Sequence, residues 1–139
     1  MNCLFCAIIA REISAHIVYD DAHAVGFLDA HPRATGHTLV VPKRHAETIF
    51  DIPTEDMGGL FSAVSNTAAL LEKGFSPDGF TIGINQGKAS GQAVEHLHIH
   101  IMPRWHTDGG SSIHAAVDHP PRDPLAAIAK KIQNTRTGS

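Results

Sequence analysis

A chain of 139 residues with 42% hydrophobic and 18% charged residues has the composition of a globular protein and the length of one domain with its own core. The formal net charge of -3, without a run of Lys and Arg, argues against a groove for a nucleic-acid polymer. No segment is apolar for long enough to span a membrane, and the apolar N-terminus lacks the basic region of a signal peptide. Because only two cysteines are present, we expect a cytoplasmic, reduced protein.

The hydrophobic pattern predicts strands on both sides of one long helix. Residues 3–10 form a buried strand or short helix, and extended segments follow at 17–19, 24–29, 37–42, 80–85 and 95–102. The long helix is expected from Thr54, as its N-cap, to a stop at Gly74. Residues 107–121 read as a loop, and Asp123-Pro124 caps a short helix that ends near Gln133. The pattern predicts an α+β fold with a mostly antiparallel sheet. We expect one domain over residues 1–134, with its core at about 3–104, and a disordered tail over 135–139.

The segment EHLHIHIM, residues 95–102, alternates histidine with large aliphatic residues. In a strand, side chains repeat every two positions, so His96, His98 and His100 share one face. Leu97, Ile99 and Ile101 share the other face and are expected to pack on the core. With eleven histidines in the chain, three in one row indicate a functional site.

Three kinds of site can use such a row, because imidazole is a metal ligand, a nucleophile and a proton switch. They are a zinc centre, nucleophilic catalysis by one histidine, and a module that only binds or senses a ligand. The preceding loop offers amide side chains and glycine N–H groups between Asn85 and Gln92. These donors suit an anionic phosphate better than a bare metal.

The residues His96-Leu97-His98-Ile99-His100-Ile101-Met102 match a His-φ-His-φ-His-φ-φ signature, in which φ is apolar. With this match the chain resembles the histidine triad (HIT) superfamily of nucleotide hydrolases and transferases, and most of all its Hint-like branch and bacterial relatives. The resemblance extends from about Cys3 to Arg104 and includes the segments CLFC, VYDD, FLDAHP, GHTLVVPKRH and INQGKASGQAVEH. It implies a HIT-like fold.

The resemblance also implies roles for the histidines. His98 is the expected nucleophile, which attacks the α-phosphorus to form a nucleotidyl-histidine intermediate that water then resolves. His100 is expected to stabilise the phosphate oxygens, His37 to support the site, and His96 to anchor the row. The implied substrate-binding positions are Asn85, Gln92, Gly91, Asp29, Phe27, Leu39 and Phe5. Ala93 departs from the Ser or Thr usual in Hint-type proteins, which puts the rate and the leaving-group preference in doubt.

A structural zinc site is implied by the same resemblance, with Cys3, Cys6, His45 and His96 as its four ligands. A closed Cys2His2 set is structural rather than catalytic, so we expect no catalytic metal. The expected activity is a purine nucleoside phosphoramidase working as a homodimer. Cleavage of dinucleoside polyphosphates, a non-catalytic nucleotide-binding regulator and a zinc-dependent hydrolase remain as alternatives.

Overall fold

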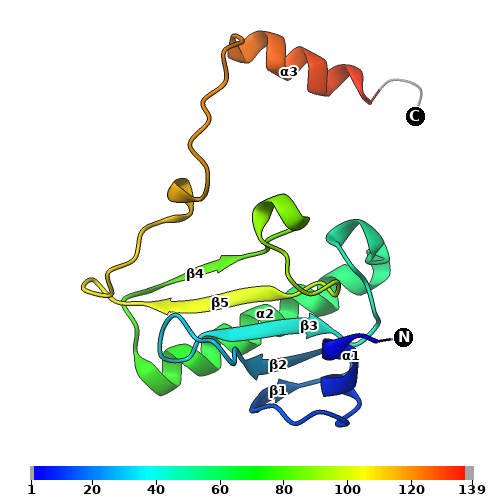
Figure 1. Ribbon diagram of the computed structural model, residues 1–139, viewed down its shortest axis with the longest axis vertical. Coiled ribbons are helices and arrows are strands. Elements are labelled where there is room, and N and C mark those ends of the chain that lie inside the picture. The colour runs from blue at the N-terminus through cyan, green and yellow to red at the C-terminus, as the bar shows by residue number, and fades with distance from the viewer. Residues whose placement is uncertain (1, 137–139) are drawn as a thin grey trace.

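The computed structural model describes residues 2–136 and contains one five-stranded sheet with a long helix behind it (Figure 1). The strands lie in the order β1-β2-β3-β5-β4, and each neighbouring pair is antiparallel. Their bounds are Ile17–Asp20 for β1, Ala24–Leu28 for β2, Thr38–Pro42 for β3, Gly79–Gly83 for β4 and Ile99–Arg104 for β5. The predicted α+β class is confirmed.

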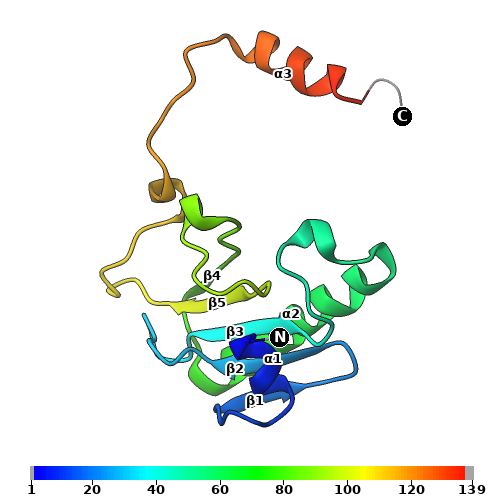
Figure 2. The same cartoon turned by 45° about the vertical axis from the view of Figure 1, so that its right-hand side comes forward.

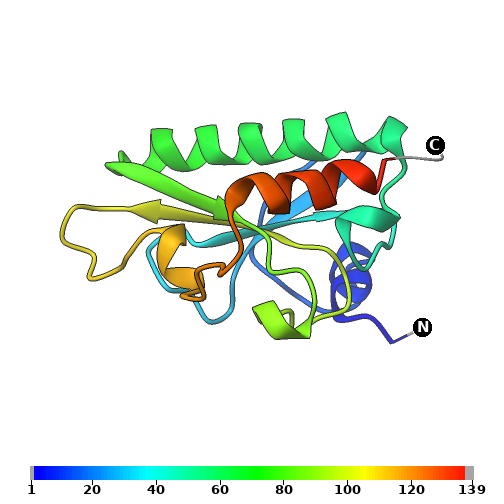
Figure 3. The same cartoon turned by 90° about the horizontal axis from the view of Figure 1, so that it is seen from above.

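The helices are α1 at Leu4–Ile9, α2 at Thr54–Phe75 and α3 at Leu125–Asn134, with 3-10 turns η1 at Ile49–Asp51, η2 at Lys88–Ser90 and η3 at Ile113–Ala116. Seen from above, α2 and α1 lie on opposite sides of the sheet (Figure 3). The apolar segment after Cys3 is therefore a short helix, and the Cys3 side chain caps it by accepting the N–H of Cys6. Within residues 2–136, no helix is both long and apolar enough to cross a bilayer.

Strand alternation divides the hydrophobic core into two clusters. One cluster packs strand residues against α2, and it includes Val40, Leu97, Ile99 and Ile101. The other packs strand residues such as Phe27 and Leu39 against α1. Because side chains point to opposite faces at alternate positions, the histidines between Leu97 and Ile101 lie on the α1 side.

The prediction of one strand over residues 95–102 is only partly right, because the ladder begins at Ile99. His96 and His98 precede it in irregular backbone, although Leu97 still points into the α2 core and its N–H donates to Ala46 O at 2.7 Å. Backbone outside a ladder has carbonyl groups that sheet hydrogen bonds do not use. This irregular backbone leaves the His96 carbonyl available to a side chain.

Both predicted ends of α2 needed correction. Pro53 rather than Thr54 is the N-cap, and the helix runs through Gly74 to Phe75. Ser76 ends it in the left-handed region at φ 47°. Gly59 is required by close packing, because a Cβ there would lie 2.6 Å from Cγ of His23.

The chain after Trp105 forms the expected polar loop, with η3 inside it, and then α3. Figures 1 and 2 show α3 standing apart from the sheet and α2 at the end of an extended connection. The short C-terminal helix is thus present. Of the tail predicted to be disordered, Thr135 and Arg136 form a turn, and residues 137–139 lie outside the described residues.

Candidate active site

His98 is held in one tautomer by the backbone. Its Nδ1 lies 2.8 Å from the carbonyl oxygen of His96, and the side chain is buried. Since a carbonyl oxygen only accepts hydrogen bonds, this contact assigns the proton to Nδ1 and leaves the lone pair on Nε2. An imidazole in this state can act as a nucleophile through Nε2.

His100 is held in the opposite tautomer through His37. The backbone N–H of Arg33 donates to Nδ1 of His37 at 3.1 Å, so the proton of a neutral His37 lies on Nε2. That Nε2 is 3.0 Å from Nδ1 of His100 and 3.5 Å from Oδ2 of Asp29. Because Nδ1 of His100 accepts this bond, its own proton lies on Nε2. His100 can therefore donate a hydrogen bond from Nε2. Its neighbour His98, whose ring centroid lies 5.2 Å away, offers a lone pair at Nε2.

Burial keeps the two supporting imidazoles neutral. Desolvation is the main cause that lowers the pKa of His100 from 6.5 to about 4, and neighbouring His98 and His37 add to it. Desolvation also lowers the pKa of His37, while Asp29 acts in the opposite direction. At neutral pH both rings are therefore uncharged, as the hydrogen-bond pattern requires.

Phe5 of α1 touches the row edge-on. Its ring centroid lies 5.1 Å from that of His98, 5.9 Å from that of His96 and 5.4 Å from that of Phe27. The side chain is only 4% exposed. Phe5 thus contacts the nucleophile candidate directly, which limits the rotation of that ring.

A cluster of two cysteines and two histidines lies at the start of the row. The Sγ of Cys3 is 3.3 Å from Nδ1 of His96, the Sγ of Cys6 is 3.3 Å from Nδ1 of His45, and the two Nδ1 atoms are 3.1 Å apart. All four ligand atoms lie within 4.8 Å of one another. A tetrahedral zinc ion with bonds of about 2.0–2.3 Å has ligand-to-ligand edges of roughly 3.3–3.7 Å. The cluster therefore has the size and chemistry to hold a metal such as zinc.

The hydrogen bond on the far side of His96 supports this interpretation. Its Nε2 lies 2.9 Å from the carbonyl oxygen of Pro42, which assigns the proton to Nε2 and turns the Nδ1 lone pair toward the thiols. Burial and neighbouring Cys3 raise the pKa of the Cys6 thiol. The two cysteines therefore become thiolates together only when a nearby cation balances their charge.

Asp29, His37 and His100 form a second cluster whose ligand atoms lie within 4.8 Å. Here the hydrogen bonds oppose a metal. A metal on Nε2 of His37 would require a proton on Nδ1, where the N–H of Arg33 already points. In this cluster the hydrogen bonds instead fix which nitrogen of His37 and of His100 carries the proton.

The predicted phosphate-binding loop brings Asn85 and Gly91 together. A Cβ on Gly91 would lie 4.0 Å from Nδ2 of Asn85, and Gly91 has a φ of 103° that favours glycine. The Gln92 amide is already used by the protein's own backbone, since Nε2 donates to Glu47 O at 2.8 Å and Oε1 accepts from the N–H of Gly87 at 2.8 Å. Asn85 is thus better placed than Gln92 to meet a ligand.

The apolar residues predicted to bind substrate are buried. Phe27 and Leu39 belong to the cluster under α1 and are 3% and 6% exposed. Asp29 is partly exposed, and its Oδ1 accepts the N–H of His31 at 2.9 Å. Core packing accounts for the two apolar residues, and their pocket role stays a prediction.

The remaining histidines lie outside the row and the two clusters. All are exposed, namely His16, His23, His31, His106, His114 and His119. Sequence reasoning missed the groups that order the protons, which are the carbonyls of Pro42 and His96 and the N–H of Arg33. Because these are backbone atoms, no residue type marks them in a sequence.

Proteins of known structure share this architecture over most or all of the chain. A crystal structure of a HIT family member from Bacillus subtilis is 36% identical and covers 100% of both chains with a TM-score of 0.84. A hypothetical histidine triad nucleotide-binding protein from Sulfolobus tokodaii is 31% identical, with a TM-score of 0.72 over 95% of this chain and 87% of its own. A HIT family hydrolase from Legionella pneumophila is 36% identical, with a TM-score of 0.64 over 73% and 91%. The HIT domain model matches residues 10–107, and this chain belongs to the HIT domain family.

Proposed function

We propose that this protein is a nucleotide hydrolase that cleaves purine nucleoside phosphoramidates at the α-phosphate through a nucleotidyl-histidine intermediate on His98. The observation that carries the proposal is the pair of opposite tautomers on neighbouring rings. His98 offers a lone pair at Nε2, and His100 offers an N–H at Nε2. Relatives described as a nucleotide-binding protein and as a hydrolase support the same class of reaction.

In the first step, Nε2 of His98 attacks the α-phosphorus and the bond from phosphorus to the leaving nitrogen breaks. The leaving amine takes a proton from solvent, and the positive charge that forms on His98 is shared with the His96 carbonyl through Nδ1–H. The Nε2–H of His100 donates to a phosphoryl oxygen as charge develops there. In the second step, water attacks phosphorus, the bond to Nε2 breaks, and a nucleoside monophosphate and a proton are released.

The position of Asn85 beside Gly91 supports a contact to the phosphate or the leaving group. We place the base near Phe5, Phe27 and Leu39 and the ribose hydroxyls near Asp29. Because Ala93 has no hydroxyl, this chain lacks one donor for the leaving group, and we expect slower turnover with poor leaving groups. We propose that the protein is a cytoplasmic homodimer.

We propose that the Cys3, Cys6, His45 and His96 cluster holds a structural zinc ion. When bound there, zinc supplies a crosslink between α1, the segment after β3 and the start of the histidine row. The chain's own atoms complete the connection, since His96 ligates through Nδ1 while its carbonyl orients His98. The cluster can thus position the nucleophile without touching substrate.

The test is to incubate the protein with adenosine 5′-phosphoramidate, quench with denaturant and measure the mass of the intact chain. We expect an adenylyl adduct and turnover, and neither in a His98→Ala variant, with a rate loss of at least about 10³-fold. His16→Ala, which changes an exposed histidine, is the matched control and should behave as wild type.

Three results would overturn parts of the proposal. Adduct formation only with a dinucleoside tetraphosphate would change the substrate, and nucleotide binding without any adduct would indicate a regulator. Loss of all turnover when a chelator removes metal, with the fold retained, would favour a catalytic zinc.

A further inference from the structure

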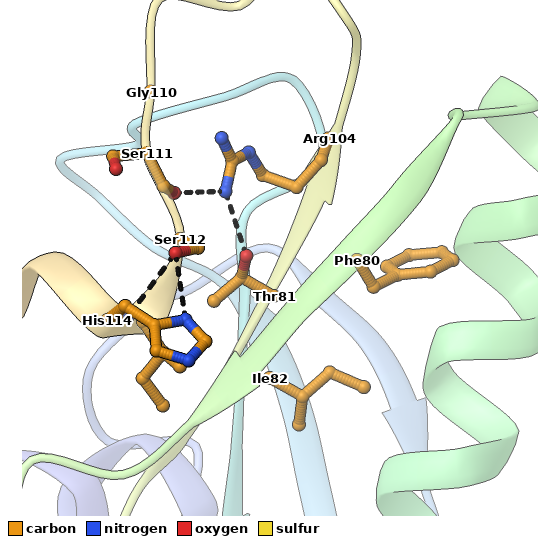
Figure 4. A pocket seen from close by; sticks show the side chains of 9 residues that line it. Phe80, Thr81, Ile82, Arg104, Gly110, Ser111, Ser112 and His114 are labelled. Carbon is orange, nitrogen blue, oxygen red and sulfur yellow. Dashed lines mark hydrogen bonds between the residues drawn. The ribbon is translucent and has the colours of Figure 1, made fainter.

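A cavity of about 530 Å³ lies between β4 and residues 110–114, away from the row of histidines (Figure 4). Its guanidinium group, on Arg104, forms an ion pair with Asp108 at 2.6 Å. Arg104 also donates to Thr81 at 2.9 Å and to the carbonyl of Ser111 at 2.7 Å. Because these contacts are all internal, the cavity does not present this cation to a ligand. The reactive groups that the proposed hydrolysis leaves unused lie elsewhere, in α1.

The two cysteines of the chain, Cys3 and Cys6, are placed to form a disulfide with each other. Cys3 is the N-cap of α1 and Cys6 is the third residue of that helix, and Cys6 N–H donates to Sγ of Cys3 at 3.4 Å. Both sulfurs belong to a group of ligand atoms that lie within 4.8 Å of one another. Residues three apart on a helix have Cα atoms roughly 5 Å apart, which is inside the range of about 4.4–6.8 Å that a disulfide spans.

An oxidant in solution can reach this pair. Each cysteine is half-buried, whereas His96, the histidine ligand beside them, is fully buried. The zinc ion proposed above would keep both sulfurs as thiolates, which is the form of cysteine that peroxides oxidise. The fold thus holds two accessible sulfurs next to each other in their reactive form.

A disulfide between the two cysteines would dismantle the metal cluster. It removes two of the four ligands and leaves only His45 and His96, whose Nδ1 atoms are 3.1 Å apart. A structural zinc site needs four ligands in a closed set. Two imidazoles cannot complete such a set, so oxidation of the sulfurs and release of the ion should occur together.

Two contacts connect this pair to the nucleophile candidate. Phe5 lies between the cysteines in the sequence, and its ring centroid is 5.1 Å from that of His98. The carbonyl of His96 accepts the Nδ1–H of His98 at 2.8 Å, while Nδ1 of His96 faces Sγ of Cys3 at 3.3 Å. Both groups that orient the His98 ring are therefore attached to the cluster that oxidation would disrupt.

We propose that Cys3 and Cys6 are a redox-active pair, which hydrogen peroxide converts to a disulfide with release of zinc and a fall in hydrolase activity. One thiolate attacks the peroxide, the O–O bond breaks, and a sulfenic acid and hydroxide form. The other thiolate attacks that sulfur, the S–O bond breaks, the S–S bond forms and a second hydroxide leaves. The cysteines lose two electrons, the peroxide gains them, and the metal is released as Zn²⁺.

The experiment titrates the zinc-loaded full chain with hydrogen peroxide in the absence of other reductants. A metallochromic dye measures released zinc, a thiol reagent counts free cysteines in denaturant, and intact-mass spectrometry identifies the product. We expect both thiols to disappear in step with zinc release and the chain to become lighter by two hydrogen atoms. Turnover of the phosphoramidate should fall by about tenfold, and dithiothreitol with added zinc should restore it.

Cys3→Asp separates disulfide formation from general oxidation. Aspartate keeps an N-cap acceptor and a carboxylate that can ligate zinc, but it removes one sulfur. We expect this variant to gain oxygen on Cys6 instead of losing two hydrogen atoms, and to release zinc several-fold more slowly. His16→Ala retains both sulfurs, changes an exposed side chain, and should respond to peroxide as the wild type does.

The inference rests on the zinc site proposed above, but its zinc and thiol readouts need no hydrolase activity. Zinc that stays bound with both thiols free, or zinc release with sulfinic acids in place of a disulfide, would overturn it. A disulfide between two chains, seen by electrophoresis without reductant, would also overturn it. Zinc release with unchanged turnover would refute the connection to His98 alone. A chain that hydrolyses no nucleotide before oxidation would refute the proposed function and leave the redox pair standing.

Discussion

Two clusters of potential metal ligands lie at the two ends of one row of histidines, with His98 between them. Cys3, Cys6, His45 and His96 form one, and Asp29, His37 and His100 form the other. By distance alone they are alike, since the ligand atoms of each lie within 4.8 Å. They differ in the hydrogen bond on the outer side of the histidine. A carbonyl receives the outer N–H of His96, whereas an N–H points at the outer nitrogen of His37.

In both clusters, the hydrogen-bond partner of one imidazole nitrogen decides what the other nitrogen can do. When the outer nitrogen donates to an acceptor, the inner nitrogen keeps a lone pair, which suits a metal or an electrophile. When the outer nitrogen accepts from a donor, the inner nitrogen carries the proton, which suits a hydrogen bond. By this rule His98, whose Nδ1–H donates to the His96 carbonyl, keeps a lone pair on Nε2, the atom that we propose attacks phosphorus.

The largest loss of stability should come from disrupting the proposed zinc cluster. A Cys3→Ser variant should fall from about one bound zinc per chain to none and lose several kcal/mol of stability. Turnover should fall by only about tenfold, because the His96 carbonyl still orients His98. Elemental analysis, thermal unfolding and phosphoramidate turnover measure the three quantities. Full zinc content in this variant would refute the proposed ligand set.

A change at His37 should lower turnover without changing the zinc content. His37→Leu removes the donor to His100, and we expect a loss of roughly 10- to 100-fold in kcat with unchanged zinc content. His37→Gln keeps an N–H donor and should recover part of the loss. Nitrogen NMR of the His100 ring should show the Nε2–H tautomer in wild type and a mixture in His37→Leu. Zinc loss in His37→Leu would mean that the second cluster also holds metal.

The smallest effect is a pH dependence of stability from the second cluster. The unfolded chain binds a proton on His100 below about pH 6.5, whereas the folded chain does so only below the lowered pKa of about 4. Protons therefore favour the unfolded state in this window, and the free energy of unfolding should rise with pH by on the order of 2 kcal/mol. Denaturant titrations from pH 4.5 to 7.5 measure it. A His100→Leu variant should show a shallower slope, and an equal slope would exclude His100 as the source.

Much of the fold was predictable, because it depends on periodicity. The alternation through Leu97, Ile99 and Ile101 correctly placed one face on the core. The start of the ladder at Ile99 was not predictable, because it depends on pairing across the sheet: the last pair is Val40 with Ile99, although β3 continues to Pro42. The same holds for α3, since the sequence predicted the helix but not its place relative to the sheet (Figure 1).

From the sequence, strand alternation indicated that His96, His98 and His100 share one face, because a strand puts alternate residues on one side. The placement of His37 and of Cys3, Cys6 and His45 next to that row came from the resemblance to the HIT superfamily, since the register of one strand does not say which distant segments reach it. Only the tertiary structure decided where the protons lie on His96, His98 and His100. The groups that decide it are backbone atoms of Pro42, His96 and Arg33, which every residue type supplies and only the fold brings into place.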